Sequence, residues 1–520
     1  MRFSKLNIEN TKSKLKYLLF LPLLIYFGKR SLIAYDEGFY ALQARWIIEK
    51  SNWIGPMWWD EVTSDRTIGI QFLIAISKKL FGDSLFVIYI PIILSAILMI
   101  YCTYELHKEL IKDKNPIYSA LILSTTFLWV NYAHMATQDI VFSSLVSLGL
   151  ISTIKAYKTN NKNQILISGS WIGLAFMMKT YLTAIPLLGL FPFLIRSKLI
   201  YNRNFWIGTF LGFLPFLLWS YKYISIYSFS TYSGLFEKLI FLSNNNHFTN
   251  PFYYYLWNFS INIFPWTIPS FIGFFKASRL NIISRYFLFY YPIFILVLLS
   301  LFSTKTPYYP IQILSLISIN SYIGIKYFIQ NNKNNIIFYL ERINFLIIPT
   351  LTIAFIIIIN FSKIIYLDNR AKAFIFVGAG LFSLIWIIYN LLKNKKRKLN
   401  FAILGPYLLI LFLVQSGIIT DKSKELRIAI EDLVKNENLS NKSIEIIKPE
   451  FKDDETVSKI IKILVKTPNI GERRLDNLSE LSRESYAWTT KEFNKNINHK
   501  KYQIVNEDKV FYPWKLIYKK

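Results

Sequence analysis

Long apolar runs separated by short polar connectors are the dominant pattern along this chain. Many of the runs approach the roughly 20 residues that an α-helix needs to cross the hydrocarbon core of a bilayer. Backbone groups inside lipid must be hydrogen-bonded within the segment, so we expect helices and not open sheets. The pattern predicts about thirteen membrane-spanning helices on this length criterion. They fall at residues 17–34, 84–106, 116–134, 139–156, 164–178, 180–195, 205–224, 259–275, 286–303, 308–328, 343–362, 372–392 and 399–419.

The basic residues of the chain gather in every second connector. If the N-terminus is cytoplasmic, all of these basic connectors are cytoplasmic, as the positive-inside rule requires. The other connectors and the tail after residue 419 then face the outer side. Lys29 and Arg30, near the outer end of the first helix, depart from this scheme; they either snorkel outward or serve a site there.

The composition agrees with a membrane protein. The 520 residues are 53% hydrophobic and 17% aromatic, and the chain has too many apolar runs of spanning length for a soluble core. The formal net charge of +28 would suggest nucleic acid as the partner of a soluble protein. Here the Lys and Arg residues lie between apolar runs, so we expect membrane lipids and no nucleic acid as partners. Cys102 is the only cysteine, which excludes an intramolecular disulfide and a Cys-rich metal site.

Two adjacent carboxylates, Asp36 and Glu37, emerge directly from the first apolar run, where ionised side chains are unfavourable unless they are partnered or functional. A helix that ends in water explains them equally well. The segment that follows, EGFYALQARWIIEKSNWIGPMWW, interleaves aromatic and charged residues. It predicts a helix in the interface plane with its tryptophans, Trp46 among them, at headgroup level. This context favours Asp36 as the centre of a membrane-embedded active site.

The later part of the same connector and two further outer connectors contain ionisable residues with both an ordinary and a functional explanation. Asp65-Arg66 is either a surface ion pair, which contributes little, or a metal-binding acid beside a guanidinium that grips phosphate. Asp139 begins a helix, where the helix dipole already favours an acid. Lys179 lies between two apolar segments and therefore needs an anion or an exit to water.

Two more residues complete the set of candidates. Lys305 stands beside Pro307 and Pro310, whose breaks in the helix leave backbone groups free to line a cavity. His247 lies in an Asn-rich segment. A histidine in such a segment is most often solvated and less often a metal ligand.

The composition changes sharply at about residue 420. The tail is rich in charge, with amphipathic helix patterns in KSKELRIAIEDLVK and ETVSKIIKILVK and strand-like patterns in SIEIIK, YQIVN and KVFYPWKLIY. We therefore expect a transmembrane domain over residues 1–419 and a small extracytoplasmic α/β domain over residues 420–520.

Taken together, these segments resemble the polyprenyl-phosphate-sugar-dependent glycosyltransferases of the GT-C superfamily, in particular the aminoarabinose-lipid A transferase and protein O-mannosyltransferase group. Six segments carry the likeness, in the order that the family shows. They are YDEGFYALQAR, DRTIGIQFLIAISKKLFG, TQDIVFSSL, GLAFMMKT, HFTNPFYYYLW with the FPW after it, and STKTPYYPIQIL. The start of the tail, TDKSKELRIAI, also looks like the first part of that group's periplasmic domain.

The resemblance implies a GT-C fold and an enzyme in a bacterial inner membrane. The enzyme would move a sugar from a polyprenyl-phosphate donor to a lipid, protein or glycan acceptor at the outer face. The implied residue roles fall into three groups: catalytic acids at Asp36, Glu37 and Asp139; donor-phosphate binding at Arg66, Lys179 and Lys305; and candidate ligands of a divalent metal ion at Asp65 and His247. Thr67-Ile68 replace the family's two prolines, so the shape of this loop and the sugar preference do not follow from the likeness.

A transporter or flippase of a lipid-linked substrate is the alternative from another functional class. Such a protein needs charges near the midplane and broken helices in matching halves of the chain. The ionisable residues here gather on one predicted face, and no internal repeat is visible. A non-catalytic scaffold would not need both acids and three bases on that face. The sequence therefore favours the transferase, with all of these residues converging in one cavity.

Overall fold

A computed structural model describes residues 16–33, 35–58, 61–63, 65–113, 115–244, 250–331, 335–361, 368–448, 453–467, 470–490, 501–506 and 509–520. The chain forms two compact units. Unit 1 comprises Met1–Gly28, Pro91–His134 and Gln138–Ile419, and unit 2 comprises Lys29–Ile90, Met135–Thr137 and Thr420–Lys520. The polar loop after the first apolar run therefore folds with the tail, which the sequence pattern does not reveal. The predicted boundary between residues 419 and 420 stays a prediction.

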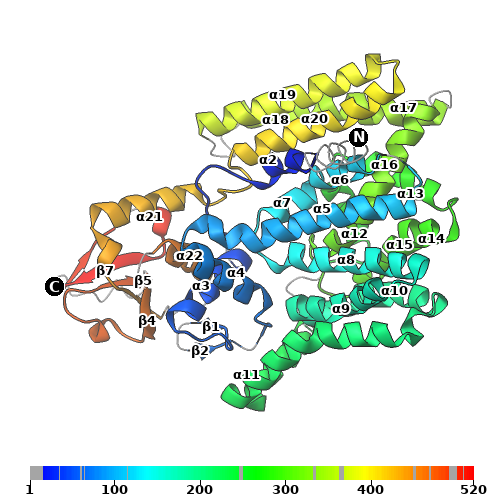
Figure 1. Cartoon of the computed structure of the whole chain (residues 1–520). Helices are drawn as coiled ribbons and strands as arrows, with labels where there is room; N and C mark the ends of the chain where they lie inside the picture. The colour runs from blue at the N-terminus through cyan, green and yellow to red at the C-terminus, as the bar shows by residue number, and fades with distance from the viewer. Residues whose placement is uncertain are drawn as a thin grey trace, which may run out of the picture. The chain divides into compact units, whose positions relative to one another are not determined.

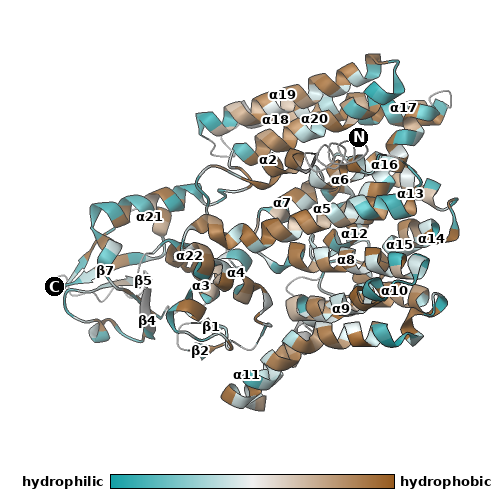
Figure 2. Ribbon diagram, viewed as in Figure 1, coloured by the Kyte–Doolittle hydropathy of each residue, from teal (hydrophilic) through white to brown (hydrophobic). Residues whose placement is uncertain are grey.

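Unit 1 is built of helices that are apolar along most of their length (Figures 1 and 2). The longer ones are α5 (Ile90–Leu110), α8 (Gln138–Thr159), α9 (Lys162–Lys179), α10 (Ala184–Arg196), α11 (Arg203–Asn244), α13 (Thr267–Ala277), α15 (Tyr291–Leu301), α16 (Leu314–Gln330), α18 (Ile348–Phe361), α19 (Asn369–Leu391) and α20 (Lys395–Gln415). The shorter ones are η1 (Lys16–Phe20), α2 (Leu21–Leu24), α6 (Ile117–Ser124), α7 (Phe127–Ala133), η3 (Thr180–Thr183), η4 (Leu199–Tyr201), α12 (Tyr254–Asn262), α14 (Ile282–Arg285), η5 (Tyr286–Tyr290), η6 (Tyr309–Ile313), α17 (Asn335–Arg342) and η7 (Ile343–Ile347).

Within the described residues, seven helical segments are long and apolar enough to cross a membrane. The predicted count of about thirteen stays a prediction, because several of the predicted runs are not single helices. The run at 116–134 is interrupted at Thr125-Thr126, between α6 and α7. The run at 259–275 is interrupted between α12 and α13, where Pro265 cannot donate a backbone hydrogen bond.

Helices α9 and α11 approach one another unusually closely because glycines face backbone. A Cβ at Gly173 would lie 2.1 Å from the backbone nitrogen of Phe213, and one at Gly212 would lie 2.0 Å from the carbonyl oxygen of Ser170. Small residues that permit such approach are typical of helix packing in membranes, where association depends on close van der Waals contact. This packing fixes the helix that ends at Lys179.

Unit 2 combines helices with two small sheets. The elements are α3 (Asp36–Glu49), β1 (Met57–Trp58), β2 (Glu61–Val62), α4 (Gly69–Phe81), η2 (Leu85–Tyr89), α21 (Lys424–Asn436), η8 (Leu439–Asn441), β3 (Ile444–Ile447), α22 (Asp454–Lys466), β4 (Ile470–Leu475), η9 (Leu478–Glu480), β5 (Tyr486–Thr489), β6 (Tyr502–Ile504), η11 (Lys509–Phe511) and β7 (Lys515–Lys519). The larger sheet has the strand order β4-β3-β5-β7-β6. Strand β3 runs parallel to β4 and β5, and β7 runs antiparallel to β5 and β6.

The predicted helix patterns in the tail are confirmed. Of the strand patterns, the first part of KVFYPWKLIY is wrong, because KVF forms η11 and only KLIY lies in β7. KSKELRIAIEDLVK forms α21, ETVSKIIKILVK forms α22, and SIEIIK contains β3. Two strands were missed, β4 and β5, because IGERRL and YAWT are too short and too mixed in polarity to show a period of two.

The core of unit 2 joins the first loop to the tail. Leu42 and Trp46 of α3 pack in one cluster with Ile461 of α22, Trp488 of β5 and Trp514. Trp46 is 1% exposed. The interpretation of Trp46 as a headgroup-level residue of an interfacial helix is therefore wrong. An amphipathic pattern shows which face is apolar but not whether lipid or protein covers it.

Candidate active site

Asp36 begins α3 and points away from the core of unit 2, with 45% of its side chain exposed. Arg66 lies beside it, with Nη1 3.5 Å from Asp36 Oδ1 and Nε 3.1 Å from Asp65 Oδ2. The same Nη1 donates to the hydroxyl of Tyr40 at 2.7 Å. Burial alone would lower the pKa of Arg66, but Tyr40, Asp65 and Asp36 raise it, so the guanidinium stays charged. An accessible carboxylate and a fixed cation thus share one edge of the unit.

Glu37, the neighbour of Asp36, has the opposite environment. It is 2% exposed. Its Oε1 accepts from the Tyr89 hydroxyl at 2.7 Å and from the Ala136 N–H at 2.9 Å, and its Oε2 accepts from the Ile33 N–H at 3.0 Å. Burial raises the pKa of Glu37, while these three donors and Arg30 oppose that effect. With both oxygens engaged, Glu37 anchors the first turn of α3.

Helix α22 of the tail holds α3 in place. Tyr35, just before α3, donates from its hydroxyl to the carbonyl oxygen of Asp454 at 3.1 Å, and Arg45 donates from Nη1 to the carbonyl oxygen of Thr467 at 2.8 Å. Burial and Asp454 together raise the pKa of Tyr35 to about 12. A Cβ at Gly38 would lie 2.6 Å from Cγ2 of Ile461, so only glycine lets α22 pack at this turn. The position of Asp36 therefore depends on the tail.

A second group of predicted residues lies in unit 1. Asp139, at the start of α8, and Lys179, at the end of α9, form a direct ion pair and are 5% and 7% exposed. The Lys179 ammonium also lies 4.8 Å from the ring centre of Tyr308 and 5.6 Å from that of Tyr309. A small polar cavity borders this pair, with Gln312 among its lining residues. The anion that the sequence required for Lys179 is thus Asp139.

Lys305 is 5% exposed, and its ammonium donates to the carbonyl oxygens of Asn250 at 2.8 Å and Phe302 at 2.6 Å. Burial lowers the pKa of Lys305. The hydroxyl of Tyr255 donates to the next carbonyl, that of Thr306, at 3.0 Å. Lys305 therefore ties the loop after α15 to the segment that leads into α12.

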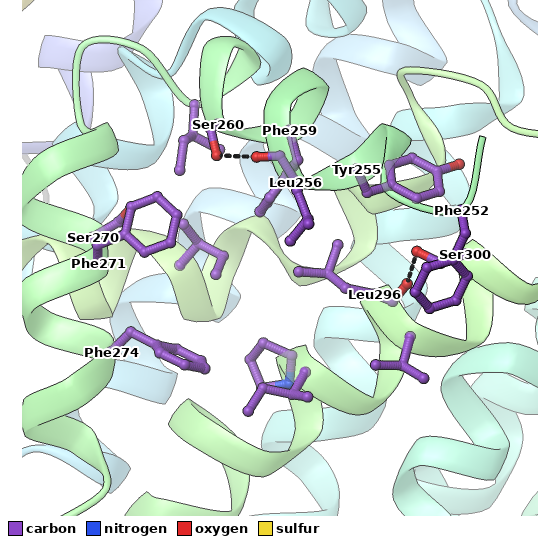
Figure 3. A pocket seen from close by; sticks show the side chains of 15 residues that line it. Phe252, Tyr255, Leu256, Phe259, Ser260, Ser270, Phe271, Phe274, Leu296 and Ser300 are labelled. Carbon is purple, nitrogen blue, oxygen red and sulfur yellow. Dashed lines mark hydrogen bonds between the residues drawn. The ribbon is translucent and has the colours of Figure 1, made fainter. Parts of the chain in front are cut away.

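An apolar groove in unit 1 is bordered by Tyr255 and by the helices α12, α13 and α15 (Figure 3). Its cavity volume is about 270 Å³. Two of its serines are satisfied by their own helices, since Ser260 donates to the carbonyl oxygen of Leu256 at 2.5 Å and Ser300 to that of Leu296 at 2.8 Å. The groove therefore presents an almost wholly apolar surface, and Tyr255 connects it to the Lys305 loop.

The predicted site residues thus form two groups. Asp36, Glu37, Asp65 and Arg66 lie in unit 2, and Asp139, Lys179 and Lys305 lie in unit 1. That both groups meet in one cavity stays a prediction. Sequence reasoning missed Tyr40, although it lies one helical turn after Asp36, where side chains meet. It also missed Tyr308 and Tyr309, whose only signal is their place just after Lys305.

Of the two predicted metal ligands, only Asp65 lies in the described part of the chain. Asp65 is paired with Arg66, and His247 lies outside the described part of the chain. Across the described ranges, no three His, Cys, Asp or Glu side chains gather in a way that would hold a metal ion. Because His247 is outside the described residues, the metal site stays a prediction, and no step of the chemistry is assigned to a metal.

Comparison with known proteins shows what the sequence and the fold of this chain are similar to. Residues 65–221 match the family model described as dolichyl-phosphate-mannose-protein mannosyltransferase. The whole chain has the fold of the ArnT protein from Cupriavidus metallidurans, solved bound to undecaprenyl phosphate and in the apo state. The TM-score is 0.75 over 99% of this chain and 98% of the ArnT chain bound to undecaprenyl phosphate, at 11% sequence identity. The resemblance to polyprenyl-phosphate-sugar-dependent GT-C glycosyltransferases is confirmed, as is the polytopic α-helical membrane fold.

Two relatives are similar to this chain over part of its sequence. The undecaprenyl phosphate-alpha-4-amino-4-deoxy-L-arabinose arabinosyl transferase 2 of Pseudomonas fluorescens is 26% identical over 169 residues, which are 31% of this chain and 29% of the relative. The arabinosyl transferase of Yersinia pestis is 25% identical over 31% of this chain and 30% of the relative. The aligned part thus spans less than a third of these relatives. None of the proteins named here is a transporter, so the comparisons give that alternative no support.

Proposed function

We propose that this protein is an inverting glycosyltransferase that moves a sugar from a polyprenyl-phosphate donor to a lipid, protein or glycan acceptor. One observation carries the proposal. Of two adjacent acids at the start of α3, Glu37 is buried with both oxygens engaged, whereas Asp36 is presented outward beside Arg66. That arrangement holds one carboxylate rigidly in an accessible position, which a general base requires.

The reaction that this geometry supports is a displacement at the anomeric carbon. The acceptor hydroxyl forms a bond from its oxygen to that carbon and passes its proton to Asp36. The bond from the carbon to the phosphate oxygen breaks, and the polyprenyl phosphate leaves as an anion, which needs no protonation. Attack opposite the leaving group inverts the anomeric centre. Arg66 stabilises negative charge close to Asp36, because it is fixed in position by its contacts to Asp65 and Tyr40.

Lys179 and Lys305 are proposed to bind the donor phosphate, as the family likeness implies. In the present arrangement Lys179 is neutralised by Asp139, and Lys305 binds two carbonyl oxygens. A donor phosphate would therefore compete with Asp139 for the Lys179 ammonium. The tyrosine rings beside Lys179 favour a cation at this point whichever anion is bound.

The apolar groove is the proposed place of the isoprenoid tail. Its lining offers few unsatisfied polar groups, and Tyr255 joins it to the loop that contains Lys305. A tail in the groove would therefore bring its phosphate end toward a cationic side chain. The C. metallidurans ArnT with this fold was solved with undecaprenyl phosphate bound, which supports a lipid phosphate as the donor here.

The proposed setting is a bacterial inner membrane, with the N-terminus cytoplasmic and both Asp36 and the tail on the outer side. The distribution of basic connectors supports this orientation. A divalent metal ion, with Asp65 and His247 as ligands, is proposed only on the family likeness. Chelation with EDTA tests it: lost transfer that returns with one divalent ion would support the metal, and unchanged transfer would exclude it.

The decisive experiment uses the purified protein and radiolabelled polyprenyl-phosphate sugars. We expect the wild-type protein to release sugar from the lipid carrier, and we expect Asp36→Asn to abolish that release while the protein remains inserted and folded. The exposed pair between Asp36 and Arg66 contributes at most about 1 kcal/mol, so its loss should hardly change stability. Near-normal transfer by Asp36→Asn would refute the assignment.

A further inference from the structure

A second polar pocket lies in unit 2, where α21 and α22 pack beside the segment that precedes α3. Its cavity volume is about 10 Å³, close to the least that holds one water molecule. The pocket therefore has room for one water-sized group, such as a single oxygen of a larger anion. Its polar lining consists of two hydroxyls and three cationic side chains: Ser31, Ser423, Arg427, Lys462 and Lys466.

Arg427 lines this pocket and is 6% exposed. Its Nε and Nη2 donate to the two carboxylate oxygens of Asp421 at 3.1 and 2.8 Å, and its Nη1 lies 3.2 Å from Glu431. Glu431 is also 2.6 Å from the ammonium of Lys29 and 3.9 Å from that of Lys466. Three cations thus lie close to one glutamate, and the ammonium of Lys466 is the farthest of the three from it.

Lys462 increases the excess of positive charge. Among the residues that the structure describes, no carboxylate lies within ion-pair distance of its ammonium. Burial lowers the pKa of Lys462, and nearby Lys459 adds to the effect. Burial also lowers the pKa of Lys466; the charges of Glu431 and Asp421 oppose this effect, and those of Arg427 and Lys29 reinforce it. Partly buried ammonium groups that repel one another are stabilised by a bound anion.

A neighbouring pocket shows what a neutral arrangement looks like. On the other side of Val465, a cavity is bordered by Arg45, Lys78 and Asp83. There each cation has its own acid, since Arg45 pairs with Glu49 at 2.5 Å and Lys78 pairs with Asp83. Cations near α22 are therefore not left unpaired as a rule, and the excess charge is a feature of the first pocket alone among these two.

We propose that the pocket formed by Ser31, Ser423, Arg427, Lys462 and Lys466 binds a phosphate group. The two ammonium groups match the charge of a phosphate and its several acceptor oxygens, whereas the Arg427 guanidinium is already paired with Asp421 and Glu431. The Ser31 hydroxyl accepts from the Ser423 N–H at 2.7 Å, so its own proton is left to donate toward the pocket. The phosphate is either free or part of a membrane lipid headgroup. This site is separate from the residues proposed for glycosyl transfer and does not depend on that function.

The test compares the full-length protein with Lys462→Gln and with Lys462→Gln/Lys466→Gln, all in phosphatidylcholine nanodiscs. Lys435→Gln is the matched control, because it removes the same charge from an exposed position on α21. In the first arm, inorganic phosphate is titrated by calorimetry. In the second, nanodiscs containing phosphatidylglycerol are used, and native mass spectrometry counts the anionic lipids that remain bound.

We expect wild type and Lys435→Gln to bind phosphate alike, and the double variant to bind it at least about tenfold more weakly, because charge-assisted contacts are the strong ones. If only the lipid arm separates the double variant from wild type, the phosphate belongs to a headgroup and the proposal stands. If neither arm separates them, the proposal is overturned. Lys462→Gln keeps the test valid if the double variant misfolds, because Lys462 has no ion pair among the described residues to lose.

Discussion

Because Asp36 is exposed and Glu37 is buried, replacing each by its amide should affect the stability of the protein differently. We expect Glu37→Gln to destabilise the protein substantially, although it changes one oxygen into an NH₂ group of nearly the same size. Within the described part of the chain, three groups hydrogen-bond to the Glu37 carboxylate and all three are donors: the Ile33 and Ala136 N–H groups and the Tyr89 hydroxyl. A glutamine offers one acceptor and one donor, so its NH₂ must face a donor.

The magnitude follows from these contacts. The glutamine oxygen best replaces Oε1, which accepts two hydrogen bonds, and the NH₂ then faces the Ile33 N–H. A buried donor left without an acceptor costs about 1–3 kcal/mol. The two remaining bonds lose the strength that a charged acceptor provides, about 1 kcal/mol each. The sum is about 3–5 kcal/mol, which for a unit of this size lowers the midpoint of thermal unfolding by roughly 10 °C.

The assay is thermal unfolding of the detergent-solubilised protein, followed by tryptophan fluorescence. Trp46, Trp488 and Trp514 lie in the core of unit 2 and report on its unfolding. Asp36→Asn is the matched control, since it makes the same chemical change one residue away on an exposed side chain, and we expect a shift of only about 2–3 °C from the loss of at most about 1 kcal/mol. If Glu37→Gln unfolds at the wild-type temperature, or if Asp36→Asn is the more destabilised of the two, the division into an anchoring and a reacting acid is wrong.

Three further predictions concern unit 1. Asp139→Asn should cost about 3–5 kcal/mol in thermal unfolding because it leaves Lys179 buried without its partner, and adding Lys179→Met should restore part of the loss; an additive loss would contradict the pair. Gly173→Val should lower the yield of folded protein after detergent extraction because it forces α9 away from α11. Gly380→Val is the control, because a Cβ there meets nothing within 4 Å, and it should not lower the yield. Equal yields of the two variants would disprove the close packing. Leu256→Trp should fill the apolar groove and raise the KM for donors with a long isoprenoid by about tenfold, the range expected from filling an apolar pocket. The KM for a short-chain donor should stay unchanged. An equal effect on both donors would place the isoprenoid tail elsewhere.

Much of the architecture could be read from local pattern, because membrane helices and amphipathic helices are specified by the residues they contain. Apolar length predicted where the apolar helices lie, although several of the predicted runs are interrupted, and a period of 3.6 predicted α21 and α22 with their bounds nearly correct. The candidate residues were found in the same way, since an ionised side chain next to an apolar run is unusual wherever it occurs. The apolar sequence on both sides of Lys179 also predicted that this residue needs an anion.

The sequence pattern could not show which segment of the chain covers the apolar face of another segment. Asp36 and Glu37 are neighbours with the same charge, yet successive helix positions point about 100° apart, so one faces outward and the other is buried among donors that include Ala136, some hundred positions along the chain. Trp46 is covered by the tail, and Gly38 matters only because α22 packs on it. The residues themselves determined the helices and the chemistry available; tertiary contact between distant segments decided which acid is accessible, which cation is already neutralised, and where positive charge is left in excess.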